Sequence, residues 1–226
     1  MSRLVAAVLF DLDGTLVDSA PDLAGACNDM RAARGMEALR YPVLRAMVGS
    51  GARGMIGAGF GISPTEPAYD LLRDEFLERY EARMTRDTMV FPEAARLLER
   101  LQQEGRPWGI VTNKAARFAE PLVRFLGLAD IAATLVCGDT TGHSKPHPAP
   151  LLEAARRMAT RPETCVYVGD DHRDVQAGRA AGMWTVAAAW GYLGNADPVD
   201  AWGADAICAT PSDVLAWIDS TRSFPT

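Results

Sequence analysis

The sequence predicts an α/β protein with a Rossmann-like, doubly wound parallel sheet and an all-helical domain inserted after the first strand. Short apolar runs alternate with helical patterns along most of the 226 residues, which is typical of parallel strands joined by crossover helices. Residues 20–87 break this rhythm and contain no convincing strand. Polar residues follow several apolar runs directly, and in open parallel sheets ligands bind beyond the carboxyl ends of the strands.

Six apolar runs are the predicted strands. The first, Leu4–Phe10, stops at a carboxylate without a small-residue cleavage site, which favours a buried strand over a secretion signal. The other five are Trp108–Thr112, Thr134–Cys137, Cys165–Val168, Thr185–Ala188 and Ala206–Ala209. Helical segments separate them. In "EAARLLERLQQEG", apolar residues at helical spacing form one stripe, and Gly105 follows as a stop signal.

The insertion is predicted to be a small helical domain at residues 20–87, leaving residues 1–19 and 88–226 for the α/β core. It opens with Pro21 at a plausible first-turn position of a helix. Apolar and aromatic side chains recur at helical spacing near its end, at Leu72, Phe76 and Tyr80.

Composition restricts the possible partners. A net charge of −6 disfavours nucleic acid and anionic membranes, and no apolar run approaches the length of about 20 residues that a membrane span needs. The four cysteines are widely spaced, which indicates free thiols in a reducing compartment. We therefore expect a cytoplasmic monomer or homodimer that binds a small molecule.

The motif "DLDGT" at the end of the first predicted strand raises an electrostatic problem. Asp11 and Asp13 are two residues apart, so in an extended chain their carboxylates point the same way. Two such anions 4 Å apart repel by about 4 kcal/mol at an effective dielectric constant of about 20. A divalent cation would offset this repulsion, and carboxylate oxygens are ligands that Mg²⁺ prefers.

Further polar residues are expected at the same edge of the sheet. Thr112 and Asn113 end the second long strand, Asp170 follows a later one, and Lys145 lies in a loop just before a helix. A carboxylate can act as a nucleophile, a second as an acid and base, and an ammonium and a hydroxyl can bind phosphate oxygens. This set predicts phosphoryl transfer through an aspartyl-phosphate.

Four motifs in this order, "DLDGTLVDS", "VTN", "SKPHP" and "VGDDHRD", resemble those of the haloacid dehalogenase-like phosphatases, and the resemblance covers essentially the whole chain. It implies the core of that fold with a helical cap of the C1 type. Within the family, "VGSGARGMI" and "TNKAARFAEPL" are similar to the branch containing phosphoglycolate phosphatases and N-acetylmuramic acid 6-phosphate phosphatases.

The resemblance also implies roles for individual residues. Asp11 would be the nucleophile and Asp13 the general acid and base, while Thr112, Asn113 and Lys145 would bind phosphate. Mg²⁺ would be held by Asp11, Asp170 and the backbone carbonyl of Asp13. Asp174 and Thr15 would support this site from behind, with Asp174 orienting a metal-bound water or Lys145.

Alternative functions fit these residues to different degrees. A calcium loop is disfavoured, because Leu16 and Asp22 stand where an EF-hand needs glycine and glutamate. A dehalogenase has no need for the second acid, Asp13. A phosphomutase would keep every motif and stays open. A binding module without catalysis has no physical reason to keep three unfavourably placed charges.

Arg53 is the candidate for substrate choice in the insertion. It follows four small residues, Gly49 to Ala52, which allow a loop to approach a ligand closely. Both substrates named by the resemblance, 2-phosphoglycolate and N-acetylmuramic acid 6-phosphate, carry a carboxylate that a guanidinium could grip with two hydrogen bonds. An exposed surface arginine is the alternative.

Overall fold

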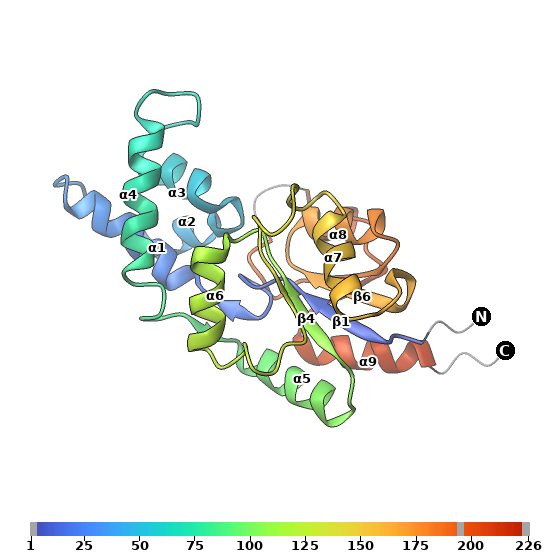
Figure 1. The fold of residues 1–226 in the computed structure, drawn as a ribbon. Helices are drawn as coiled ribbons and strands as arrows, with labels where there is room; N and C mark the ends of the chain where they lie inside the picture. The colour runs from blue at the N-terminus through green and yellow to red at the C-terminus, as the bar shows by residue number, and fades with distance from the viewer. Residues whose placement is uncertain (1–3, 194–196, 223–226) are drawn as a thin grey trace. The chain divides into compact units, whose positions relative to one another are not determined.

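The computed structural model of the chain describes residues 4–193 and 197–222 (Figure 1). It divides into two compact units. The first comprises Met1–Val17, Val90–Gly191 and Asp197–Thr226, and the second comprises Asp18–Met89 and Tyr192–Ala196. The chain passes from one unit to the other within two short paired strands, β2 (Val17–Asp18) and β3 (Met89–Val90).

The first unit contains a six-stranded parallel sheet in the order β5-β4-β1-β6-β7-β8. All six predicted strands form, as β1 (Ala7–Phe10), β4 (Trp108–Val111), β5 (Leu135–Val136), β6 (Cys165–Gly169), β7 (Trp184–Ala188) and β8 (Ala206–Cys208). The first strand begins later than predicted, because Leu4 is 62% exposed and lies outside the ladder. Strand β1 is central, with β4 on one side and β6 on the other, so the sheet changes direction of winding beside it.

Helices cover both faces of this sheet. One face packs against α5 (Pro92–Gln103), α6 (Ala116–Phe125) and α9 (Pro211–Arg222), and the other against α7 (Ala149–Arg157) and α8 (His172–Ala180). Alternation along β1 separates the two cores: Val8 and Phe10 face the first, while Ala7 and Leu9 face the second. Because both faces are buried, the strands are apolar throughout.

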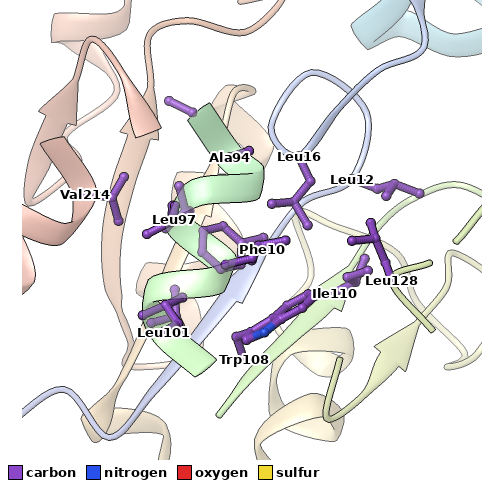
Figure 2. Close-up of a cluster of buried hydrophobic side chains, with 14 of the residues drawn as sticks. Phe10, Leu12, Leu16, Ala94, Leu97, Leu101, Trp108, Ile110, Leu128 and Val214 are labelled. Carbon is purple, nitrogen blue, oxygen red and sulfur yellow. The ribbon is translucent and has the colours of Figure 1, made fainter. Parts of the chain in front are cut away.

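Figure 2 shows the first core, where Phe10 and Trp108 meet edge to face against Leu97 and Leu101 of α5. Their ring centroids are 6.3 Å apart. Leu12 and Leu16, on either side of the second aspartate of "DLDGT", also point into this cluster.

The turn between these two leucines is closed by short-range hydrogen bonds. The backbone N–H groups of Leu16 and Val17 both donate to the Leu12 carbonyl, at 3.0 Å. Gly14 adopts φ +83°, a conformation that only glycine adopts without strain, so the glycine of the motif is required by the turn. Asp13 therefore lies in a loop fixed at both ends by the core.

The described part of the second unit between its two boundary strands is helical, as predicted. Its helices are α1 (Ala20–Ala32), α2 (Tyr41–Arg45), α3 (Gly51–Phe60) and α4 (Tyr69–Glu81), with a short 3₁₀ turn, η1 (Val48–Ser50). Asp22, fully buried in α1, accepts hydrogen bonds from the backbone N–H groups of Asp87 and Thr88 and from the Thr88 hydroxyl. This carboxylate joins the first helix of the unit to the residues just before β3.

Two expectations from composition can be compared with the described residues. All four cysteines are buried and none forms a disulfide, as the spacing predicted. Among the described helices, none has the length and apolar character that crossing a bilayer requires.

Candidate functional site

The candidate site lies at the carboxyl ends of β1, β4 and β6. Asp11 directly follows β1, and its backbone N–H still donates to the Val168 carbonyl of β6, at 2.9 Å. Asp170 directly follows β6, and Thr112 directly follows β4. The parallel register of these neighbouring strands therefore brings residues that are up to about 160 positions apart to one edge of the sheet.

Lys145 is at the centre of the site, with a side chain only 2% exposed. Its Nζ lies 2.9 Å from Asp11 Oδ1 and 2.8 Å from Asp174 Oδ1. It also donates hydrogen bonds to the Tyr167 hydroxyl, at 2.7 Å, and to the Val111 carbonyl, at 3.1 Å. The ammonium is thus surrounded by acceptors from two strands, one helix and the end of β1.

The loop that carries Lys145 is fixed to the end of β4 by Asn113. The Asn113 amide donates to the Lys145 carbonyl at 3.0 Å and accepts from the Lys145 N–H at 2.9 Å. These two hydrogen bonds set the backbone position from which the lysine side chain starts. Phosphate binding by Asn113 and by Thr112, whose hydroxyl accepts from the Lys114 N–H at 3.2 Å, stays a prediction.

Burial and neighbouring charge act in opposite directions on the central pair. Burial raises the pKa of Asp11 to about 6, although the adjacent Lys145 lowers it, and Asp174 and Asp13 raise it further. Burial disfavours the charged form of Lys145, but Asp11 and Asp174 outweigh this effect and raise its pKa. Lys145 therefore stays protonated. Around Asp11, the negative charges outnumber the positive ones.

The carboxylates of this site suit a hard divalent cation. One oxygen each from Asp11, Asp170 and Asp174 lie within 4.8 Å of one another. Asp11 Oδ1 is buried and, among the described residues, forms an ion pair with Lys145 but no hydrogen bond of good geometry. An added cation would satisfy this oxygen and offset the excess negative charge.

The supporting residues show which carboxylates are available as ligands. Thr15, fully buried, donates from its hydroxyl to Asp170 Oδ1 at 2.9 Å, as expected of a residue behind the site. Asp174 instead accepts from the Asp171 N–H through Oδ2 and contacts Lys145 through Oδ1. Of the two predicted tasks for Asp174, orientation of Lys145 is the one that the geometry favours.

Helix α8 begins at this site with a capping box. Asp171 is the N-cap: its side chain accepts from the Arg173 N–H, and the Asp174 carboxylate accepts from the Asp171 N–H. Burial opposes ionisation of Asp171, but the hydrogen bonds from Arg173 prevail and lower its pKa. Asp171 thus serves the helix start.

The second aspartate of the motif pairs with a residue that the sequence analysis did not select. Lys114 Nζ lies 3.1 Å from Asp13 Oδ1 and 3.0 Å from Asp13 Oδ2. Tyr167, the hydroxyl partner of Lys145, was also not selected, because a tyrosine in an apolar strand gives no signal of its own. A signal for Lys114 does exist: of the 23 basic residues, the only lysines are Lys114 and Lys145.

Arg53 lies in the second unit and is exposed, but it belongs to helix α3, so the loop that the preceding small residues predicted is wrong at this position. It borders an open cavity of about 280 Å³ together with Gly57, Gly61, Ile62, Ser63 and Pro64. No carboxylate of the described residues forms an ion pair with this guanidinium. A role in substrate choice stays a prediction.

Tyr167→Phe removes one acceptor from the Lys145 ammonium without changing the packing of the ring. The third N–H of the ammonium can still reach the Val111 carbonyl, so we expect turnover of a phosphate ester to fall by no more than about tenfold, the equivalent of one ordinary hydrogen bond. Steady-state kinetics with p-nitrophenyl phosphate would measure this change, and thermal unfolding would control for stability. Unchanged kinetics would mean that the two carboxylates and the Val111 carbonyl fix the lysine without the Tyr167 hydroxyl.

Comparisons of sequence and of structure find known proteins that match nearly the whole chain. The chain is 46% identical over 219 residues to a phosphoglycolate phosphatase of Xanthomonas campestris, covering 95% of this chain and 98% of the relative. It is 41% identical over 214 residues to an N-acetylmuramic acid 6-phosphate phosphatase of Pseudomonas putida, covering 95% and 96%. A crystal structure of a predicted phosphoglycolate phosphatase from Haemophilus somnus superposes with a TM-score of 0.82 at 25% identity, covering 96% and 99%.

The family is shown by a match that includes the whole candidate site. The sequence model of the haloacid dehalogenase-like hydrolases matches residues 5–182, a range that extends from β1 to the end of α8. The four ordered motifs, the strand order and the relatives agree with this match. The chain therefore belongs to the haloacid dehalogenase-like hydrolase family.

Proposed function

We propose that the chain is a Mg²⁺-dependent phosphatase that hydrolyses a small carboxylated phosphate monoester through an aspartyl-phosphate on Asp11. The observation that carries the proposal is the buried cluster of Asp11, Asp170, Asp174 and Lys145, with Asp13 two residues beyond the nucleophile. Relatives named as phosphatases, covering nearly the whole chain, support hydrolysis over transfer to a second sugar.

The reaction would take two steps. An Asp11 oxygen attacks phosphorus, the ester P–O bond breaks, and the proton of Asp13 passes to the leaving alkoxide. Water then attacks the aspartyl-phosphate and gives a proton to Asp13, and the bond between phosphorus and Asp11 breaks to release phosphate. Lys145 holds charge that develops on the transferring group, because its ammonium already lies 2.9 Å from the nucleophile.

The cation would be held by the carboxylates of Asp11 and Asp170 and by the backbone carbonyl of Asp13. When bound, it supplies positive charge that lets a phosphate dianion approach these carboxylates. Thr15 orients Asp170 for this task through the 2.9 Å hydrogen bond. Gly191 leaves room for the Asp170 side chain, because a Cβ at position 191 would lie 2.2 Å from the Cβ of Asp170.

The proposed substrates are 2-phosphoglycolate and N-acetylmuramic acid 6-phosphate, the compounds for which the two relatives are named. Both combine a phosphate ester with a carboxylate. Because the protein carries a net charge of −6, the carboxylate needs a local cation, and the exposed Arg53 is the proposed one. We place the enzyme in the cytoplasm, where such phosphorylated metabolites occur with reduced thiols.

Asp11→Asn tests the covalent step. The amide is nearly isosteric but a much poorer nucleophile, so turnover should fall by at least about 1,000-fold with the fold retained. Asp171→Asn is the matched control, since asparagine also caps helices and this residue lies beside Asp170. Circular dichroism would verify folding of both variants. Substantial turnover by folded Asp11→Asn would exclude the aspartyl-phosphate.

Removal of divalent cations should abolish turnover, and Mg²⁺ should restore it. Ca²⁺ should restore little, because its larger and looser coordination shell is poorly suited to a site that must keep reacting groups in line. Activity after exhaustive chelation and readdition of each cation would measure this. Full activity of the cation-free protein would remove Asp170 from the proposed ligand set.

Arg53→Ala tests substrate choice. If the guanidinium binds the substrate carboxylate, the variant loses one charge-assisted hydrogen bond, worth about 1.5–3 kcal/mol of binding free energy. KM for a carboxylated substrate should rise by the corresponding factor. Turnover of p-nitrophenyl phosphate, which has no carboxylate, should change little. Comparing kcat/KM for 2-phosphoglycolate, N-acetylmuramic acid 6-phosphate and p-nitrophenyl phosphate in both proteins also decides which ester is preferred. A parallel loss on all three would indicate a structural role.

A further inference from the structure

The distribution of the two lysines is unusual. The other 21 of the 23 basic residues are arginines. Lys145 contacts the proposed nucleophile and Lys114 contacts the proposed acid, each at about 3 Å. An ammonium is a compact charge with three donors, whereas a guanidinium is a planar fork, so the two are not equivalent in a confined site. Both lysines of the chain thus contact an aspartate of "DLDGT".

Lys114 starts from a fixed backbone. Its N–H donates to the Thr112 hydroxyl at 3.2 Å, and its carbonyl accepts from the Gly138 N–H at 2.9 Å. Gly138 approaches this segment so closely that a Cβ there would lie 2.2 Å from the Asn113 carbonyl oxygen. The Lys114 side chain is only 8% exposed, and that of Asp13 is 20% exposed.

Asp13 also starts from a fixed backbone, in the turn that Leu12, Gly14 and Val17 close. The ammonium therefore restrains the remaining freedom of Asp13, which is rotation of its side chain. When the carboxyl carries a proton on one oxygen, the other oxygen can still accept from the ammonium. The same contact can hold the group both before and after proton transfer.

We propose that Lys114 is a positioning residue for Asp13: its ammonium contacts both carboxyl oxygens and thereby fixes the orientation in which the Asp13 carboxyl is presented to the leaving group of the substrate. This inference rests on the proposed function, in which Asp13 protonates the leaving group. It predicts that replacing Lys114 lowers kcat more for a leaving group that needs protonation than for one that does not. It also predicts that Lys114 has no effect on the reaction once Asp13 is absent.

The test is a double-mutant cycle of wild type, Lys114→Met, Asp13→Ala and the double variant. Phenyl phosphate and p-nitrophenyl phosphate are the matched probes, since both lack a carboxylate and they differ only in the basicity of the leaving group. Lys114→Met should lower kcat for phenyl phosphate about 10- to 100-fold, part of what a positioned acid contributes, and less than about threefold for p-nitrophenyl phosphate. In the Asp13→Ala background it should cause no further loss.

Two variants control for charge and shape. Arg117→Met makes the same change of charge at an exposed position three residues away, and should leave both activities unchanged. Lys114→Arg should recover part of the loss on phenyl phosphate, since a guanidinium can also donate to a carboxylate.

Independent evidence comes from NMR of protein labelled with ¹⁵N-lysine, which has only two side-chain ammonium groups. Comparison with Lys114→Met assigns them. Asp13→Ala should make the Lys114 ammonium exchange faster with water and weaken its signal, while the Lys145 signal persists. An unaffected Lys114 signal would overturn the contact.

The outcomes separate the two proposals. An equal loss on both probes from Lys114→Met, or a loss that adds fully to that of Asp13→Ala, would overturn the positioning role. A rise in KM without a change in kcat would instead make Lys114 a substrate-binding residue. If Asp13→Ala itself shows no dependence on the leaving group, the acid role in the proposed function fails, whatever Lys114 does.

Discussion

The Lys145 ammonium is held by groups from four elements, and the site depends on all of them. Asp11 directly follows β1, β4 supplies the Val111 carbonyl, β6 supplies the Tyr167 hydroxyl and α8 supplies Asp174. An ammonium in this buried position would be costly without such partners. The contacts therefore require the three strands to end at the same level and α8 to begin there.

Charge balance explains why this cluster suits phosphoryl transfer. One ammonium faces Asp11 and Asp174, with Asp170 close by, so negative charge exceeds positive charge. Burial raises the pKa of Asp11 to about 6 against the opposing effect of Lys145, and the carboxylates of Asp174 and Asp13 raise it further. A divalent cation removes the excess and leaves the site able to accept an anionic group, which connects the proposed cation with the proposed substrate.

Residues close together in the sequence serve different parts of the site. In "GDDHRD", Asp170 is aimed at the proposed cation site by Thr15, Asp171 caps α8, and Asp174 supports both the cap and Lys145. Alternation along β6 places Tyr167 on the α7 and α8 side of the sheet, together with Cys165, while its neighbours Val166 and Val168 fill the opposite core. Such division of tasks follows from the direction of each side chain rather than from its type.

The sequence by itself determined the class of fold, the six strands of the sheet and the helical character of the insertion, because these depend on local periodicity and on turn residues such as Gly14. It also predicted that Asp11, Asp170 and Lys145 lie together, since polar residues after parallel strands converge by topology, whereas Asp174 and Thr15 were implied by the resemblance to the family. Only the tertiary structure decided which atoms meet: Lys114 with Asp13, Tyr167 with Lys145, and Asn113 with the Lys145 backbone. These are contacts between segments 22 to 101 residues apart, and their geometry depends on packing that no local pattern records.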